Sequence, residues 1–345
     1  MKQLLYFFFL IVILTSCQQT SQKLRLAEEI IETQPDSALK ILREIDFQNE
    51  KSDRNKALYG ILMFKALDKN YLSLTPDSLI NFSIKFYQDK NDNEKLGEAL
   101  FYKGRSYNYA NQYENATKLY MLALDNLKGS KEYNLLAKIY SDLGRISVVQ
   151  GEFKNTREKF QKAIICFYLD GDSTNACFVK MDIANTFRTE RQFNKAHEIY
   201  IDILKNSDDS LLTGIALQEI GINFFWHNKF DSALSYLKKS IKYPHTAFYN
   251  SIRLLRLADT YYELNRYDSA MYFAKMSLEF PGNFYTKREC YRILANTCYL
   301  KKDFKTMAEY MTHYQTMVDS VSKIDSQTKA TVIEQAHLST TKAKK

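Results

Sequence analysis

The feature that most constrains this sequence is a repeating pattern of two amphipathic helical segments joined by a short polar turn. The repeats start at residues 97, 137, 177, 214, 251 and 288, so their offsets are 40, 40, 37, 37 and 37 residues. Helical periodicity predicts that each repeat is a pair of antiparallel helices. A single pair cannot bury its apolar face, so the pattern predicts an array in which successive pairs pack together.

Small and apolar residues recur at fixed positions of the aligned repeats. The first segment carries a small residue where two helices approach closely, and an apolar or small residue follows one helical turn later on the same face. The second segment carries another small position. The first positions are Gly104, Gly144, Ala184, Gly221, Ala258 and Ala295, the next are Tyr107, Ser147, Phe187, Phe224, Tyr261 and Cys298, and the last are Ala116, Thr156, Ala196, Ala233, Ala270 and Met307.

These spacings resemble the tetratricopeptide repeat (TPR), although that repeat usually has a period of about 34 residues. Thr156 and Met307 depart from the alanine of the family pattern. We expect the additional residues in the turns between repeats, at 128–134 and 169–175. The resemblance implies an all-α fold over residues 24–320, a right-handed α-solenoid of about seven or eight stacked antiparallel helix pairs.

Two of these pairs are predicted upstream of the aligned repeats, at residues 24–46 and 56–88. Their motifs PDSAL and PDSLI return later as FDSAL and YDSAM. Asp or Ser before an apolar helical pattern can accept hydrogen bonds from the free amides of a helix start. The motifs therefore predict helix caps, and so a structural role, for Asp36, Asp77, Asp231 and Asp268.

The N-terminal segment has the order of a secretory signal, with one lysine, an apolar run over residues 4–14 and small residues before Cys17. The apolar run is too short to cross a bilayer core of roughly 30 Å. LTSC, residues 14–17, resembles the lipobox of bacterial lipoproteins. This resemblance implies removal of residues 1–16, lipidation of Cys17 and a membrane-anchored, periplasm-facing protein with residues 17–23 as a polar tether. An ordinary secretory signal with an incidental cysteine is the alternative.

Composition supports a helical body and disfavours nucleic-acid binding. Ten Gly and four Pro are few for 345 residues, which argues against a fold with frequent tight turns. The net charge of +8 is dispersed, because acidic residues are interleaved along the chain. Residues 321–345 form a polar, Lys-ended tail for which we expect partial helicity at most.

The cysteines after Cys17 are four and contain no C-x-x-C motif. Cys290 and Cys298 are too far apart along one helix for a disulfide. Cys166 and Cys177 flank a predicted turn and could meet in an oxidising compartment. The alternative, which we favour, is that all four are small buried hydrophobes.

The sequence contains no motif that predicts catalysis or metal binding. No H-E-x-x-H, P-loop, G-x-G-x-x-G or nucleophile elbow is present. The histidines are scattered singly, at His197, His227, His245, His313 and His337. We therefore expect a protein that is not an enzyme and that has no metal or cofactor.

Solenoids bind through an extended concave face. The TPR resemblance assigns this face to particular positions of the first helices and implies peptide-binding roles for Phe101, Arg105, Asn108, Tyr109, Arg145, Asn185, Arg188, Phe225, Trp226, Tyr262 and Asn296. Lys138, Gln218, Leu255, Asp259, Arg292 and Tyr299 fall on the same face. Arginine and asparagine in the first half suit an acidic or C-terminal peptide, and aromatic residues in the second half suit apolar side chains. Alternatively, these residues pack against neighbouring helices, or the N-terminal segment fills the groove.

The predicted function is that of a membrane-anchored adaptor or scaffold that binds a protein or peptide of the cell envelope. One alternative is the sensor half of a truncated TPR-containing regulator. Another is a glycan-binding lipoprotein resembling the SusD class, although such proteins are longer and carry insertions that this sequence lacks.

Overall fold

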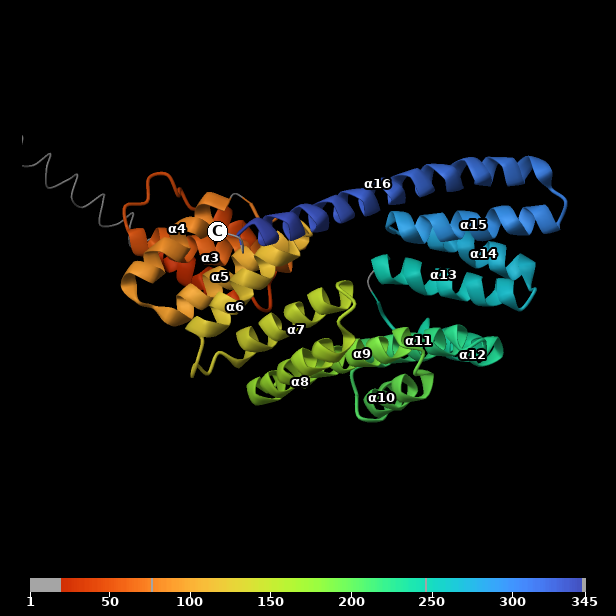
Figure 1. Cartoon of the computed structure of the whole chain (residues 1–345), viewed down its shortest axis with the longest axis horizontal. Helices are drawn as coiled ribbons and strands as arrows, with labels where there is room; N and C mark the ends of the chain where they lie inside the picture. Colours follow the sequence, from red (N-terminus) through yellow and green to blue (C-terminus); the bar gives the residue numbers. More distant parts are fainter. Residues whose placement is uncertain (1–19, 76, 246, 343–345) are drawn as a thin grey trace, which may run out of the picture. The chain divides into compact units, whose positions relative to one another are not determined.

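The computed structural model describes residues 20–75, 77–245 and 247–342, and in these ranges all regular secondary structure is helical (Figure 1). The predicted signal peptide, residues 1–16, and the predicted lipidation site, Cys17, lie outside the described residues. Within the described ranges, no helix is long and apolar enough to cross a membrane.

The predicted helix pairs are confirmed. Upstream, a helix over residues 20–30 pairs with α2 (Pro35–Arg43), and α3 (Asp53–Lys69) pairs with α4 (Asp77–Lys90). The six aligned repeats are α5 (Asn93–Tyr109) with α6 (Tyr113–Asn126), α7 (Tyr133–Val149) with α8 (Phe153–Asp170), α9 (Ser173–Thr189) with α10 (Phe193–Lys205), α11 (Ser210–Trp226) with α12 (Phe230–Ser240), α13 (Ala247–Glu263) with α14 (Tyr267–Glu279), and α15 (Phe284–Leu300) with α16 (Phe304–Lys342).

Contacts between residues divide the chain into two compact units. Among the described residues, the first unit comprises those from 20 to 139 and from 335 to 342, and the second comprises those from 140 to 334. The first boundary falls inside α7, so this helix contributes residues to both units. We describe the packing of each unit separately.

The turn within each aligned pair has one conformation. In the first of these turns Asn111 is left-handed, with φ of 58°. Its N–H donates to the carbonyl of Asn108 at 3.0 Å, and the N–H of Gln112 donates to the carbonyl of Tyr107 at 2.9 Å, which is the Schellman pattern. The equivalent left-handed residues are Gly151, Arg191, Asn228, Asn265 and Lys302, and they repeat with the predicted offsets. The predicted repeat register is therefore confirmed by the backbone.

Variation in repeat length is confined to the other end of each pair. The first helices α3, α5, α7, α9, α11, α13 and α15 each have 17 residues. The predicted longer turn at 128–134 corresponds to the connection between α6 and α7. At 169–175 the prediction is wrong, because the additional residues extend α8, which has 18 residues and ends at Asp170.

Side-chain caps occur on several first helices and on one second helix, α16, where Asp303 accepts from the N–H of Thr306 at 3.2 Å. Asp92 accepts from the N–H of Lys95 at 3.1 Å, and Asp172 and Asp209 cap α9 and α11 in the same way. The predicted caps at Asp36, Asp231 and Asp268 are wrong, because the N-cap residues are Gln34, Lys229 and Arg266 and make no side-chain cap bond. Asp36, Asp231, Asp268 and Asp77 lie in first turns, where a carboxylate interacts favourably with the helix dipole.

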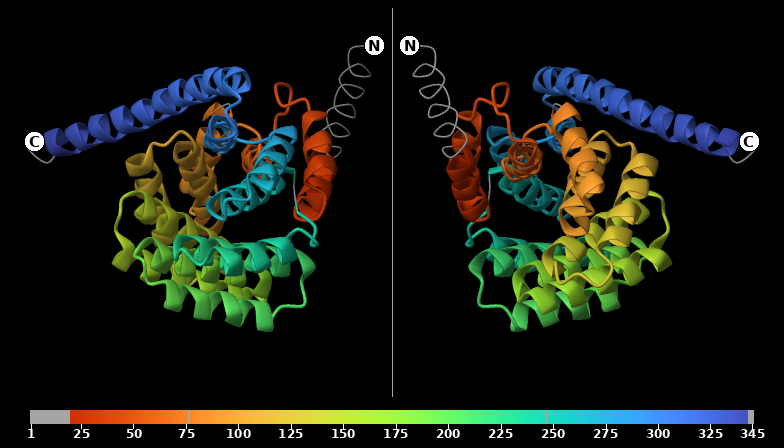
Figure 2. Two further views of the ribbon diagram at one scale, coloured as in Figure 1. Left: turned by 90° about the vertical axis from the view of Figure 1, so that its right-hand side faces the viewer. Right: turned by 90° about the vertical axis from the view of Figure 1, so that its left-hand side faces the viewer.

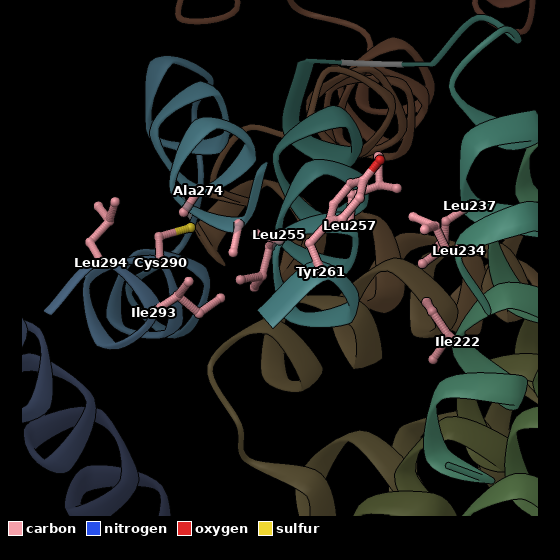
Figure 3. Close-up of a cluster of buried hydrophobic side chains, with 12 residues drawn as sticks. Ile222, Leu234, Leu237, Leu255, Leu257, Tyr261, Ala274, Cys290, Ile293 and Leu294 are labelled. Carbon is pink, nitrogen blue, oxygen red and sulfur yellow. The ribbon is translucent and has the colours of Figure 1, made fainter. Parts of the chain in front are cut away.

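The small first-helix positions are sites of close helix approach, as predicted. A Cβ atom added to Gly104 would lie 2.6 Å from the ring of Tyr120 on α6. In the second unit, α11 to α15 enclose a continuous apolar core, and Figure 3 shows Cys290 beside Ala274 between α14 and α15. The core residues of this cluster are Ile222, Leu234, Leu237, Leu255, Leu257, Ala258, Tyr261, Ala270, Ala274, Cys290, Ile293 and Leu294.

The last helix is longer than the sequence predicts. α16 runs without interruption over 39 residues to Lys342 (Figure 2), so the expectation of partial helicity after residue 320 is wrong. Its first turns pack on α15, where Tyr291 stacks on His313 with ring centroids 5.0 Å apart. Cys166, Cys177, Cys290 and Cys298 are all free thiols, and the last two are buried.

We predict that Gly104→Ala lowers the free energy of unfolding by about 1–3 kcal/mol, because the new methyl group overlaps the buried ring of Tyr120. Urea denaturation followed by circular dichroism measures this change. In a Tyr120→Leu background, which makes room for the methyl group, the same substitution should cost less. An equal cost in both backgrounds would contradict the packing explanation.

Candidate functional site

A groove of about 570 Å³ crosses the first helices α11, α13 and α15 of the second unit. These helices are the first members of three successive pairs, so the groove lies on the face that the repeat positions predict. We call it the α11–α15 groove. It is lined by Phe225, Trp226, Ile252, Leu255, Arg256, Asp259, Glu263, Asn283, Tyr285, Thr286, Arg288, Glu289 and Arg292.

Aromatic side chains stand at two sides of this groove. At the end of α11, the rings of Phe225 and Trp226 meet edge to face with centroids 6.0 Å apart, and Trp226 is 56% exposed. Tyr285, at the start of α15, is also exposed. Large, rigid aromatic side chains of this kind contribute strongly to the binding free energy when a bound molecule covers them.

A network of ion pairs forms the polar part of the groove. The buried carboxylate of Asp259 accepts from Arg256 at 3.1 Å and from Arg292 at 3.0 Å. Glu289 in turn accepts from Nε of Arg292 at 2.7 Å and from Nε of Arg288 at 2.8 Å. These bonds connect α13 to α15 and fix the orientation of the guanidinium groups.

The two carboxyl groups of this network have opposite shifts in pKa. Burial raises the pKa of Asp259, although Arg256 and Arg292 oppose the rise. Burial also acts to raise the pKa of Glu289, but hydrogen bonds from Arg292 and Arg288 outweigh it and lower the pKa. Within the described part of the chain, the buried Nε of Arg256 has no hydrogen-bond acceptor.

Some predicted residues of the second unit lie in this groove and others do not. Phe225 and Trp226 line it, together with Leu255, Asp259 and Arg292 from the same predicted face. Tyr262 and Asn296 are half-buried and do not line it. Tyr262 instead packs edge to face on Tyr267 at the turn that follows α13.

Arg145, Asn185 and Arg188 are engaged in bonds between helices. Arg145 donates to Asp182 of α9 at 3.1 Å, and Arg188 donates to Glu219 of α11 at 2.7 Å. Arg188 also donates to the hydroxyl of Tyr200, which donates to Asn185 at 2.6 Å. Arg145 and Arg188 therefore connect successive first helices, and Asn185 connects α9 to α10, which is the packing alternative stated above.

In the first unit, the structure corrects the prediction for Phe101. Its side chain is fully buried between Tyr102 and Tyr120, so it cannot contact a ligand at the surface. Ser141, Met181, Gln218 and Leu255, at the equivalent positions of later repeats, are also buried. Arg292 is half-exposed at the corresponding position of the last pair.

The other predicted residues of the first unit are accessible. Arg105 forms an ion pair with Asp68 of α3 at 2.9 Å, and the exposed Tyr109 donates to the same carboxylate at 2.6 Å. Asn108 is half-buried. Lys138 is half-buried too, and its pKa is lowered by burial and by the nearby cations Lys65, Lys69 and Arg105.

The N-terminal segment contributes a carboxylate to this part of the first unit. Glu32 accepts from Lys65 at 2.8 Å and from Lys69 at 2.7 Å. Burial acts to raise the pKa of Glu32, but the two lysines together lower it to about 2. Ile31, its neighbour, is fully buried, so this segment is an integral part of the stack rather than a ligand lying on it.

Sequence reasoning missed several groove residues. Arg256, Arg288 and Glu289 form much of the charged network, and Tyr285 precedes the predicted start of its repeat. Glu289 occupies one of the first-helix positions that the TPR resemblance assigns to the concave face. The spacing of three residues between Arg256 and Asp259, and between Glu289 and Arg292, was a further signal, since such pairs meet on one helix face. Among the described residues, no cluster of three His, Cys, Asp or Glu side chains could hold a metal ion.

Comparison with known proteins supports the fold. Residues 81–225 match the family model of the soluble NSF attachment protein, SNAP. The chain is similar to the STAND protein with a tetratricopeptide repeat sensor from Pyrococcus horikoshii, with TM-score 0.62 and 14% identity over 91% of this chain and 49% of that chain. No curated protein matches the sequence.

Two further solved structures cover nearly the whole chain. The apo form of RapI has TM-score 0.57 and 13% identity over 88% of this chain and 99% of that chain. NprR in complex with its cognate peptide NprX has TM-score 0.54 and 11% identity over 93% of this chain and 99% of that chain. Together with the helix pairs, these similarities define an all-α helical repeat protein of the TPR type.

We predict that Glu32→Gln lowers the free energy of unfolding at neutral pH by about 1 kcal/mol, a value that allows for solvent screening of a half-exposed carboxylate. The folded-state pKa of Glu32, about 2, lies below the usual 4.5. The carboxylate therefore contributes its full stabilisation of the folded state above about pH 4.5, and this stabilisation is lost as the pH falls toward 2. Urea denaturation of variant and wild type at pH 7 and pH 3 measures the difference.

Glu29→Gln is the matched control, because Glu29 lies on the helix directly before Glu32 and, in the described part of the chain, forms its ion pair with the exposed Arg25. Its effect should be small at both pH values. A cost of Glu32→Gln that does not shrink in acid would contradict the ion-pair explanation.

Proposed function

We propose that this protein is a TPR scaffold that binds a peptide or an extended protein segment in the α11–α15 groove. A lipid on Cys17 attaches it to a membrane of the cell envelope, with the solenoid facing the periplasm. The observation that carries the proposal is the groove itself, in which exposed Trp226 stands beside the ordered Arg256–Asp259–Arg292 network.

The chemistry of the groove suits a peptide. Its lining contains three arginines and three carboxylates, so it can meet side chains of either charge. Because the guanidinium groups are already held in place, binding need not order them, and little affinity is lost to side-chain entropy.

The structural similarities support peptide binding as a use of this fold. NprR is described in complex with its cognate peptide NprX, and a Rap protein is described in complex with competence and sporulation factor. The identities of 11% and 12% relate these proteins to this chain through the fold alone. We therefore assign the ligand class from the groove and not from the relatives.

The second candidate is a sensor half of a signalling regulator. It is favoured by one observation, the 49% coverage of the STAND protein, which is described as having a tetratricopeptide repeat sensor. In this second candidate function, the same groove binds the signalling molecule, and a separate protein carries the regulatory output domain. Binding rather than catalysis fits both candidates, because Asp259 and Glu289 are held in ion pairs.

We predict that Trp226→Ala reduces capture of the partner in a crosslinking pull-down from native membranes by about tenfold or more, as expected when an aromatic anchor is removed. Tyr272→Ala is the matched control, because Tyr272 on α14 is 60% exposed and does not line the groove. Equal capture by the two variants would overturn the assignment of the groove.

We predict that Cys17→Ala releases the protein from the membrane, because the lipid would have no attachment site. The measurement is the distribution of the protein between membrane and soluble fractions, with Cys166→Ala as the control for loss of a thiol. If Cys17→Ala leaves this distribution unchanged, the proposed lipid anchor is wrong. The Trp226→Ala experiment would still test peptide binding in the groove.

A further inference from the structure

The turns that follow the last three first helices carry a repeated aromatic pair. Phe225 packs on Phe230 with centroids 5.5 Å apart, Tyr262 packs on Tyr267 at 5.8 Å, and Tyr299 packs on Phe304 at 6.2 Å. All three pairs are edge to face, with interplanar angles of 64°, 62° and 67°. The pairs repeat because the Schellman turn between them is the same in each repeat.

These turns adjoin one another along one edge of the second unit. Phe193, which follows the turn after α9, stacks on His227 of the next turn with centroids 4.9 Å apart. Lys301, in the last turn, forms an ion pair with Asp268 at the start of α14. Figure 1 shows the α13–α14 and α15–α16 turns at the same end of their helices. We call residues 188–193, 225–230, 262–267 and 299–304 the turn edge.

Large apolar side chains are exposed on the turn edge. Trp226 is 56% exposed, Tyr299 is 61% exposed and Phe304 is 58% exposed. Leu300 beside them is also exposed. Tryptophan and tyrosine combine an apolar ring with a polar group, which is the composition favoured at the boundary between lipid headgroups and acyl chains.

The outermost residues of the same turns are mainly basic. Arg191, Lys229, Arg266 and Lys302 are exposed, and none of them has an ion pair in the described part of the chain. Two carboxylates of these turns have a partner: Glu190 pairs with Arg157 at 2.6 Å, and Asp303 accepts from the N–H of Thr306. The four basic side chains therefore outnumber Glu263 and Asp303, the exposed carboxylates of the turn edge that have no ion pair in the described part of the chain.

We propose that the turn edge docks on an anionic lipid surface, with its basic residues at the lipid phosphates and Trp226, Tyr299 and Phe304 at headgroup depth. The combination of unpaired cations and exposed amphipathic rings is complementary to such a surface. This contact is separate from the lipid on Cys17 and needs no peptide in the groove. It sets the orientation of the second unit on the membrane.

The single tryptophan of the chain lies on this edge and provides a local probe. The full chain is mixed with vesicles of phosphatidylcholine, with or without phosphatidylglycerol, in which the acyl chains are brominated. Docking should quench Trp226 fluorescence strongly in the anionic vesicles, weakly in the neutral ones and less at high salt. Absence of quenching in anionic vesicles, or equal quenching in both, would overturn the proposal.

Charge reversal tests which residues dock. Arg266→Glu with Lys302→Glu should reduce the ratio of docked to undocked protein by at least about tenfold, since each basic residue near an anionic surface contributes about fivefold. Lys242→Glu with Lys275→Glu makes the same change of net charge at exposed positions off the turn edge and should have little effect. Equal loss in both double variants would show that only net charge matters and would also overturn the proposal.

A partner protein on the turn edge is the competing outcome. It would appear as shielding of Trp226 from an aqueous quencher on addition of envelope extract, with none on addition of anionic vesicles, and it would refute lipid docking. Tyr299→Ser with Phe304→Ser then separates this surface from the groove, because neither residue lines the groove. Thermal unfolding of each variant confirms that the fold is retained.

Discussion

The stack depends on the close approach of the two helices in each pair. At Gly104 the space for a side chain is already occupied by the ring of Tyr120, and the equivalent positions of the other aligned repeats carry Gly or Ala. The Schellman turn then fixes where the second helix starts. Small residues and this turn recur with the same register in the six aligned repeats, so each repeat has the same local geometry.

Successive first helices are also joined by ion pairs. Arg105 with Asp68, Arg188 with Glu219, and Arg292 with Asp259 each join one first helix to another. These pairs lie at the face that a ligand would meet, so they serve packing and can serve recognition. A ligand carboxylate that binds one of these arginines would have to share it with a carboxylate of the protein.

Most of the fold could be predicted from the sequence, because small residues and left-handed turns leave a periodic signal. The site could be predicted only in part. Periodicity identifies the face of a helix, but whether a position on it is buried depends on the crossing of the next helix, which is why Phe101 is in the core and Trp226 is not. Ion pairs such as Arg145 with Asp182 join residues far apart in sequence, and no local pattern shows them.

The constant length of the first helices has a consequence for how such a chain can change. Second helices and the connections after them vary, as the 18 residues of α8 and the 11 of α12 show, whereas the first helix and its turn do not. Insertions at the variable end leave the spacing of groove residues unchanged. The chain can therefore gain or lose residues in evolution on one side of the stack while its binding surface keeps a fixed geometry, and designed insertions should be placed there.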